Sequence, residues 1–459
     1  MRTGNFSYTK MKKISNNIRK TNTKKNIIKK YNIKRPTNTK KVGGIKVTCL
    51  GGFKEVGKNA VLIEGKTEKI LFEFGFKIDG SATPTMPKVK PDAMFISHGH
   101  LDHLGSIPML YRKWDFPIYG TAPTKEFAEL LLKDSLKIAR LNKTSREFND
   151  SHVKRMLMNW KTIRYNQKIK VGNSTVEVYD AGHLSGAAMF VLNMDGKRIL
   201  YTGDFKLDDM RTVGGANINV GKIDVIFMET TYSSREQPSR AETEKELGRL
   251  VRETLAKGGI AVLPTFAARA SENILVLHKQ KIKGPIYLDG MGKRATEIVM
   301  AYPQFTRNSI ELKNAMKKVH KIQKHTERTD ILKKPCVIVT TGGCMDGGPV
   351  VHYIKHLYAK PECSLILTGF QIPKTAGRYL VDTGRFVNDE MDLKIKMQLH
   401  QLSLSGHAGR TELFRFVKTI RPKQVICMHG DQCERFATEI SGRFSIEAVS
   451  PKPDEVLFI

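Results

Sequence analysis

Short apolar runs that end in a glycine turn and a histidine or acidic residue recur along the chain, and this pattern most constrains its fold. The clearest are AMFISHGH, STVEVYDAGH, KRILYTGDF and VICMHGD. Runs of this length bounded by glycine are typical of strands. Because each polar residue follows the last apolar position, we expect the strands to bring these residues to one sheet edge. Helical patterns such as TKEFAELLLKDSLKIARLNK lie between them, which indicates an α/β protein.

The densest group of metal-binding side chains is HGHLDH, with three histidines and one aspartate within six positions. His98 and His100 are two apart on extended backbone, so their side chains project the same way and can chelate one ion. Asp102 and His103 begin what we expect to be a helix, LDHLGSIPMLYRK, which turns them toward a second ion. Imidazole and carboxylate without thiolate favour Zn²⁺ or a similar transition metal.

Two ions need more ligands than this cluster provides, and three further strand ends offer them. His183, Asp204 and His429 each follow a strand-like run and lie beside glycine. A single histidine of this kind is more often a structural residue, but together the three complete two coordination shells. Asp204 is the plausible bridge between the ions.

The charge of the chain favours a polyanionic partner. Its 77 Lys and Arg outnumber 45 Asp and Glu, a net charge of +32. Residues 1–45 contain 14 of these bases and no acid, and without them the remainder still has 63 bases against 45 acids, a net +18. Such a surplus attracts nucleic acid. No apolar run is long enough to suggest a membrane span, and six scattered cysteines without a C-x-x-C pair fit a reduced, cytoplasmic protein.

After Tyr232 the pattern changes to regular alternation of helices and strands. We expect a helix near 241–257, the strand GIAVLP, a helix over about 268–281 and the strand PIYLDG, followed by PCVIVTTGG and CSLILTGF. Buried strands alternating with helices are typical of a parallel sheet. The low-complexity segment before the first strand has too little apolar periodicity to form a core, and we expect a disordered basic arm there.

At this level of detail the chain resembles a known family. SHGHLDH, GHLSG, TGDF and the late HG are similar to the successive motifs of the metallo-β-lactamase fold. METTY, LSLSGHAGR and VICMHGD resemble the further motifs of its β-CASP nuclease branch, in particular the archaeal cleavage and polyadenylation specificity factor-like nucleases and archaeal RNase J. The resemblance implies a four-layer αββα fold with an inserted Rossmann-like parallel-sheet domain. The expected order is an extension over 1–44, metallo-β-lactamase segments over 45–233 and 401–459, and the β-CASP domain over 234–400.

The resemblance also implies roles for individual residues. His98, His100 and His183 would hold one zinc, Asp102, His103 and His429 the other, and Asp204 would bridge them. The candidate catalytic residues are Asp102, Glu229 and His407, with Glu229 orienting His407 toward the scissile phosphate. Candidate phosphate contacts are Ser405, Gly406, Lys374 and Arg378. The family usually has aspartate where this chain has Glu73, a residue that supports the ligands without binding metal.

These roles imply a zinc-dependent ribonuclease with two zinc ions per chain. Hydroxide activated by both metals would attack phosphorus and leave 5′-phosphate and 3′-hydroxyl ends, by exonuclease or endonuclease action. His429 at the last motif favours RNA over DNA in this family. The alternatives are a catalytically weak or inactive RNA-binding scaffold subunit of a 3′-end processing complex, and a β-CASP DNA nuclease. Expected partners are RNA, a second copy of the chain and an RNA-processing complex, with no membrane.

Overall fold

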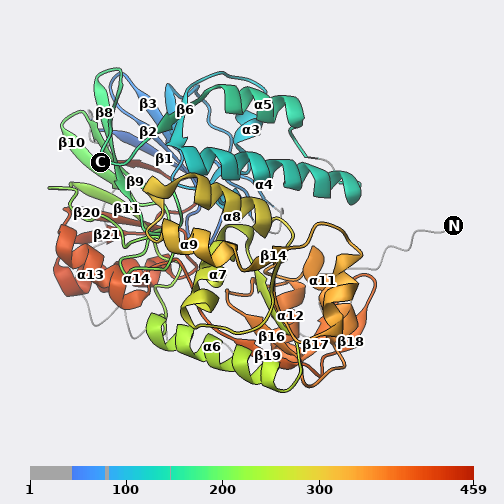
Figure 1. Ribbon diagram of the computed structural model, residues 1–459. Coiled ribbons are helices and arrows are strands. Elements are labelled where there is room, and N and C mark those ends of the chain that lie inside the picture. The colour runs from blue at the N-terminus through green and yellow to red at the C-terminus, as the bar shows by residue number, and fades with distance from the viewer. Residues whose placement is uncertain (1–43, 78–81, 145) are drawn as a thin grey trace, which may run out of the picture. The chain divides into compact units, whose positions relative to one another are not determined.

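Two seven-stranded sheets pack face to face, and a third, six-stranded sheet follows them in the chain (Figure 1). The computed structural model describes residues 44–77, 82–144 and 146–459. The expected basic arm over 1–44 therefore lies outside the described residues, except for Gly44. In spatial order the strands of the first sheet are β22 (Val456–Phe458), β1 (Lys46–Gly51), β2 (Ala60–Glu64), β3 (Lys69–Phe72), β4 (Ala93–Phe95), β5 (Ile118–Thr121) and β6 (Trp160–Ile163).

The second sheet is mixed, like the first. Its order is β21 (Glu447–Val449), β20 (Gln424–Met428), β11 (Val225–Glu229), β10 (Lys197–Tyr201), β9 (Ala188–Met194), β8 (Ser174–Asp180) and β7 (Lys168–Val171). Aromatic side chains fill the space between the two sheets. The ring of Phe190 lies 6.0 Å from that of Phe72 and 5.3 Å from that of Phe95. Rings at these separations pack favourably without stacking face to face.

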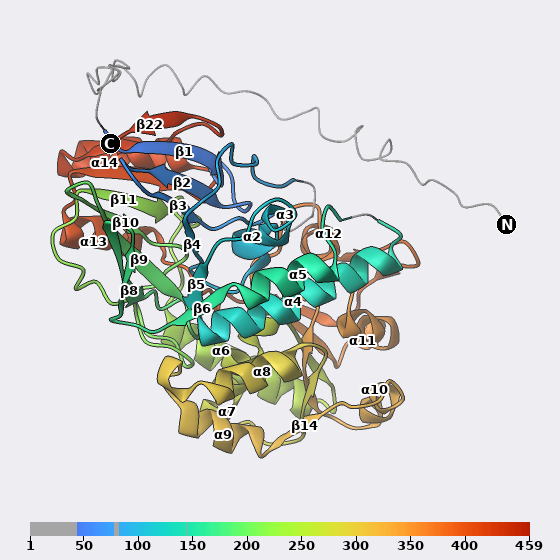
Figure 2. The same ribbon diagram turned by 90° about the horizontal axis from the view of Figure 1, so that it is seen from above.

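Helices cover the outer face of each of these two sheets (Figure 2). The first sheet is covered by α2 (Leu101–Leu104), α3 (Ile107–Leu110), α4 (Ala122–Leu141) and α5 (Asp150–Met158), which share a buried core with it. The second is covered by α13 (Arg410–Ile420) and α14 (Cys433–Phe444). This arrangement confirms the expected αββα layers. β20 comes from the end of the chain and pairs in parallel with β11, so the fold closes only when the last segment returns.

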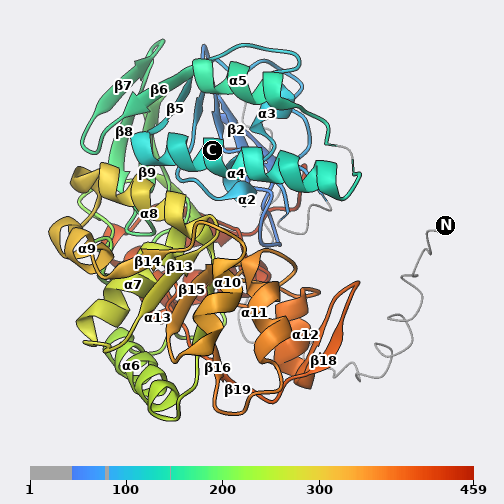
Figure 3. The same cartoon turned by 45° about the vertical axis from the view of Figure 1, so that its right-hand side comes forward.

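The third sheet is parallel throughout and corresponds to the expected inserted domain. Its order is β14 (Val319–Lys321), β13 (Ile286–Asp289), β15 (Val337–Thr341), β12 (Ala261–Thr265), β16 (Ser364–Leu367) and β19 (Gln398–Gln401). Around it lie α6 (Arg240–Ala256), α7 (Ala270–Lys279), α8 (Gly292–Ala301), α9 (Ser309–Met316), α10 (Glu327–Asp330), α11 (Pro349–Leu357) and α12 (Ala376–Thr383), with the hairpin β17 (Arg385–Val387) and β18 (Asp392–Lys394) (Figure 3). The expected domain boundaries stay predictions. Strand β19 ends at Gln401, one residue past the expected end of the inserted domain at position 400.

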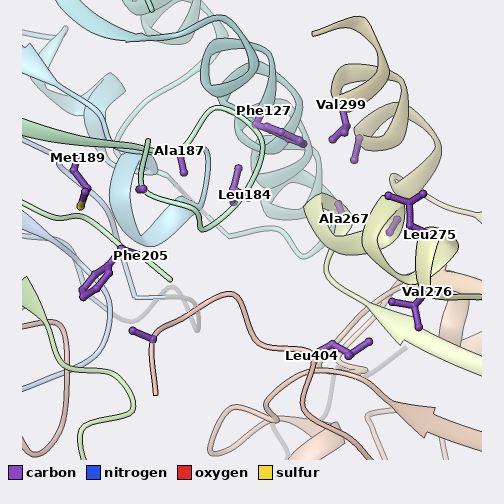
Figure 4. Packing of buried hydrophobic residues seen from close by; sticks show 14 of the residues in the cluster. Phe127, Leu184, Ala187, Met189, Phe205, Ala267, Leu275, Val276, Val299 and Leu404 are labelled. Carbon is purple, nitrogen blue, oxygen red and sulfur yellow. The ribbon is translucent and has the colours of Figure 1, made fainter. Parts of the chain in front are cut away.

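Contacts between α4 and α8 join the inserted domain to the part of the fold that contains the two seven-stranded sheets. Figure 4 shows Phe127 of α4 and Val299 of α8 approaching one another from the two helices. Beside them the Glu126 carboxylate accepts hydrogen bonds from Tyr302 Oη and from the Arg294 guanidinium, both at 2.5 Å. Apolar packing and charge therefore fix the same junction.

The segment LDHLGSIPMLYRK differs from the single helix that its pattern predicts. Helix α2 ends at Leu104, and α3 begins at Ile107 after a break at Gly105 and Ser106. A Cβ on Gly105 would lie 2.4 Å from the Phe76 ring, so the chain turns where that ring packs against it. The break keeps Asp102 and His103 on one short turn of helix, which aims both at the cluster of ligands.

Candidate metal centre and active site

Seven side chains expected at one sheet edge lie together in the structure. They come from the segments that follow β4, β8, β10 and β20, with Asp102 and His103 on helix α2, and all but His100 are buried. They are His98, His100, Asp102, His103, His183, Asp204 and His429. Groups of these residues have ligand atoms close enough together to hold a metal ion, in the combinations that the family resemblance assigns to two separate ions.

The first group surrounds one carboxylate oxygen of Asp204. His98 Nε2 lies 3.0 Å from His100 Nδ1, and His183 Nε2 lies 3.3 Å from the same atom. Asp204 Oδ2 is 3.4 Å from His98 Nε2 and 3.7 Å from His183 Nε2. Four ligand atoms thus face a common centre.

The second group shares Asp204 with the first. His103 Nε2 lies 3.3 Å from Asp204 Oδ2, whereas His429 Nε2 lies 3.4 Å from Asp204 Oδ1. The Asp102 Oδ2 atom is 3.7 Å from both of these imidazole nitrogens. Asp204 Oδ2 lies near imidazoles of both groups and Oδ1 lies near His429, so this carboxylate is placed to bridge two sites.

The spacing and burial of these atoms fit divalent metal. Tetrahedral zinc, with ligand bonds of about 2.0–2.1 Å, places neighbouring ligand atoms about 3.3–3.4 Å apart. The observed separations cluster around that value. Asp204 Oδ1 is buried and has no hydrogen-bond partner among the described residues, although a buried carboxylate oxygen normally has one. A cation between Asp204 and the imidazoles satisfies that oxygen.

Burial keeps most of these imidazoles neutral, which is the form that binds metal. It lowers the pKa of His100 to about 4 and lowers the pKa of His98 and His183 well below the ordinary value. Burial also opposes charge on His103, but the nearby carboxylates of Asp204 and Glu73 raise the pKa of that imidazole well above its usual range. The metal centre thus contains a carboxylate–imidazole pair that would release a proton when an ion binds.

Glu73 supports two ligands from behind. Its carboxylate accepts hydrogen bonds from Tyr201 Oη at 2.6 Å, from His103 Nδ1 at 2.8 Å and from Ser97 Oγ. Ser97 Oγ lies 2.9 Å from His98 Nδ1, so the same carboxylate orients ligands of both groups. Glu73 has a φ of 60°, a left-handed conformation that strains a residue with a side chain and that proteins keep mainly at functional sites.

His407 and Glu229 form a pair beside the metal ligands. Glu229 is the last residue of β11, and both of its oxygens lie within 3.1 Å of His407 Nδ1. The other ring nitrogen, Nε2, is 3.7 Å from Asp204 Oδ2. Burial disfavours a proton on this ring, but the Glu229 and Asp204 carboxylates raise the pKa of His407 to about 9. The side chain of His407 is 19% exposed against 2% for Asp204, so it is partly open to solvent beside the buried carboxylate.

The four candidate phosphate contacts divide into two pairs. Ser405 Oγ accepts the backbone N–H of His407 at 3.1 Å, and the Gly406 carbonyl lies 2.9 Å from His183 Nδ1, so both belong to the site. Lys374 and Arg378 lie at the start of α12. The Arg378 guanidinium pairs with Asp382 one turn later, with 2.9 Å between Nε and Oδ2. A phosphate contact by either residue stays a prediction.

Arg269 is a half-buried residue of the site that the sequence did not single out. It precedes α7, and its guanidinium donates to the His183 carbonyl at 3.2 Å and to the Leu404 carbonyl at 3.0 Å. A Cβ on Gly406 would lie 2.5 Å from that guanidinium, so only glycine leaves it room. One side chain of the inserted domain therefore holds both the loop of a metal ligand and the loop of His407.

Asn59 is a second contact that sequence reasoning missed. Its side-chain amide nitrogen lies 2.9 Å from His429 Nδ1 and donates to the Asp102 carbonyl at 3.2 Å. It thereby joins two ligands of the second group. The only signal in the sequence is an asparagine at the start of a buried strand, which has many structural explanations.

Three family models match successive parts of the chain. A metallo-β-lactamase superfamily domain matches residues 62–230, a Beta-Casp domain residues 273–380, and a Zn-dependent metallo-hydrolase RNA specificity domain residues 392–451. No helix among the described residues has the length and apolar content needed to cross a membrane.

Similar proteins come from archaea. The probable RNase MJ4 of Methanocaldococcus jannaschii is 34% identical over 424 residues, which cover 89% of this chain and 99% of that protein. The RNase aCSPSF2 of Saccharolobus solfataricus is 30% identical over a region that covers 88% of this chain and 83% of that protein. The transcription termination factor FttA of Pyrococcus abyssi is 32% identical over a region that covers 89% of this chain and 70% of that protein.

A crystal structure of an Enterococcus faecalis protein of unknown function has the same fold, with a TM-score of 0.56 at 16% identity, covering 91% of this chain and all of that one. The two metal-binding groups, the inserted parallel sheet and the three family matches agree with one another. The chain belongs to the metallo-β-lactamase superfamily, in the branch that carries a Beta-Casp domain and a Zn-dependent metallo-hydrolase RNA specificity domain.

Proposed function

We propose that the protein is a zinc-dependent ribonuclease that hydrolyses phosphodiester bonds at the centre around Asp204. The observation that carries the proposal is the convergence of seven candidate metal-binding side chains, six of them buried, with the His407–Glu229 pair beside them. Relatives named as ribonucleases and the RNA specificity domain support RNA as the substrate.

The ligand set fits two zinc ions, one held by His98, His100 and His183 and the other by Asp102, His103 and His429. When bound, such ions lower the pKa of water and neutralise phosphate oxygens. Asp204 holds both halves of the centre in register because its carboxylate contacts imidazoles of both groups. Glu73 and Asn59 keep the imidazoles oriented, so little reorganisation is needed when phosphate arrives.

His407 donates a proton to the departing ribose 3′-oxygen. Its Nδ1 is held by Glu229, which leaves Nε2 facing the centre, and the Glu229 carboxylate favours the protonated ring by raising its pKa. A positioned acid of this kind contributes about 10²–10⁴-fold to the rate. The products then carry a 5′-phosphate and a 3′-hydroxyl.

End-labelled RNA tests this proposal. Incubation of RNA labelled at either end, with 5′-monophosphate and 5′-triphosphate versions compared, should yield products with 5′-phosphate ends. Progressive loss from the 5′ end means exonuclease action, and discrete internal products mean endonuclease action. DNA of the same sequence should be cut much more slowly, and equal cutting of both would favour the DNA nuclease alternative.

Two variants separate the enzyme from a scaffold. His407→Ala should reduce cleavage by at least about a hundredfold while keeping close to two zinc ions per chain. His320→Ala, which changes an exposed histidine of β14, should have no effect on either measurement. Tight RNA binding without zinc and without cleavage in the unmodified protein would refute the enzymatic proposal and favour the scaffold.

A further inference from the structure

A cavity next to His407 contains an arginine held between two aromatic rings. The Arg235 guanidinium lies 4.5 Å from the centre of the Tyr232 ring and 4.7 Å from that of Phe370. The Tyr232 ring is 5.8 Å from the ring of His407, so the stack begins at the candidate catalytic residue and leads away from the metal ligands. The cavity has a volume of about 480 Å³, within the range of small-ligand sites.

The position of this cavity in the fold is one that α/β proteins use for ligands. Its wall is formed by the segment after β11, by Gly369 and Phe370 after β16, and by Gln401 to Ser403 at the end of β19. β16 and β19 are neighbouring parallel strands, and ligands of open parallel sheets bind outside the carboxyl ends of the strands.

The Arg235 guanidinium is available for a ligand. Within the described part of the chain, no hydrogen bond or ion pair uses its side-chain nitrogens, and the residue is exposed. Both rings lie against the guanidinium, and its N–H groups have no protein partner among the described residues. A planar fork of donors held in this way suits a phosphate, which it can bind through two hydrogen bonds.

The remaining walls indicate how a nucleotide would lie. Phe370 is 40% exposed although it is a large apolar side chain, so it offers a surface on which a base can stack. Glu236, Glu242 and Glu246 line the cavity and disfavour a phosphate inside it. Glu236 already accepts hydrogen bonds from Thr411 and Glu246 from Arg249, so among the described residues Glu242 is the carboxylate left to accept a hydrogen bond from the amino or imino group of a base. The phosphate therefore belongs at Arg235 and the base in the cavity.

We propose that Arg235, Phe370 and Tyr232 form a binding site for one nucleotide of a single-stranded RNA near the scissile phosphate. The inference rests on the proposed ribonuclease function and adds a site outside the metal centre. Stacking on an aromatic ring tolerates every base, so the site holds the strand without reading its sequence. A paired base could not enter the cavity, so the site favours single-stranded substrate.

Binding of a fluorescein-labelled twelve-nucleotide RNA, followed by anisotropy in the His407→Ala background, tests the site without cleavage. Phe370→Ala and Arg235→Ala should each raise the Kd by about five- to a hundredfold. Arg235→Lys keeps the charge but loses the planar fork, so it should restore only part of the affinity. Arg443→Ala is the matched control, because Arg443 is exposed and also stacks on an aromatic ring, Phe414, at 4.1 Å on the outer helical layer.

The outcomes separate this inference from the proposed function. If Arg235→Ala and Arg443→Ala raise the Kd equally, only net charge matters and the site is refuted, while RNA cleavage by the unmodified protein still supports the ribonuclease. If Phe370→Ala leaves the Kd within twofold, the base does not stack there and the inference fails. If the unmodified protein neither binds nor cleaves RNA, the proposed function fails and the site fails with it.

Discussion

Replacing Glu73 by glutamine should weaken zinc binding although Glu73 touches no metal. The carboxylate is completely buried and accepts three hydrogen bonds, from Ser97, Tyr201 and His103. Glutamine has the same shape but offers only one acceptor oxygen, so its amino group must face one of these donors. A hydrogen bond to a charged group contributes about 1.5–3 kcal/mol.

The defect reaches the metal ligands whichever way the amide lies. If the amino group faces His103, that imidazole loses the acceptor for its Nδ1 proton. This acceptor favours the tautomer in which Nε2 carries no hydrogen and can bind metal. If it faces Ser97, the hydroxyl becomes the acceptor and turns its own hydrogen toward His98 Nδ1, 2.9 Å away, which favours the wrong tautomer of His98. A loss of about 1.4–2.8 kcal/mol corresponds to a ten- to hundredfold weaker zinc affinity, the range found when such supporting contacts are removed.

Competition with a chromogenic chelator measures this affinity directly. Glu68→Gln is the matched control, because Glu68 is a buried carboxylate that accepts the Asn173 backbone N–H at 2.6 Å and Ser174 Oγ at 3.0 Å, remote from the ligands. Both variants should lose stability, but only Glu73→Gln should lose zinc. An unchanged zinc affinity in Glu73→Gln, or an equal loss in Glu68→Gln, would refute the reasoning.

Three further outcomes are expected. Arg269→Met leaves the carbonyls of His183 and Leu404 without a donor, at a cost of about 1–3 kcal/mol each, so kcat on RNA should fall at least tenfold with little change in KM; an unchanged kcat in steady-state assays would show that Arg269 only packs. Removal of metal by a chelator should lower the Tm by several degrees and added zinc should restore it, since ligand at a hundred times its Kd stabilises by about 2.7 kcal/mol; an identical Tm with and without metal in a thermal scan would contradict this. The affinity for single-stranded RNA should fall with salt, with a slope of log K against log salt of about −2 if three phosphates are neutralised, and a flat titration would argue against backbone contacts.

The candidate metal ligands could be picked out from the sequence because each is marked locally. A strand pattern, a glycine and a polar side chain at the strand end place His98, His183, Asp204 and His429 at one edge without knowledge of their neighbours. The αβ alternation of the inserted domain is local in the same sense. In the structure His183, Asp204 and His429 follow strands of the second sheet, and His98 joins them from the end of β4 in the first, so the packing of the two sheets also contributes.

The supporting residues could not be predicted because their partners are distant in the chain. Arg269 has nothing in its own neighbourhood to distinguish it from a surface arginine; its partners, the carbonyls of His183 and Leu404, are set by the way the inserted domain packs. The break after α2 likewise depends on the Phe76 ring, which the helical pattern of LDHLGSIPMLYRK does not contain. Long-range packing therefore overrides local pattern at the points where the site is adjusted most finely.

The wide separation of the ligands also has a consequence for the timing of biosynthesis. His98 emerges from the ribosome 331 positions before His429, whose strand β20 must pair with β11 before the second group of ligands is complete. At roughly 5–20 residues per second, the first ligands wait about 15–65 s for the last. A nascent chain therefore cannot complete the second group of candidate ligands until the strand that precedes His429 has been made and has paired with β11.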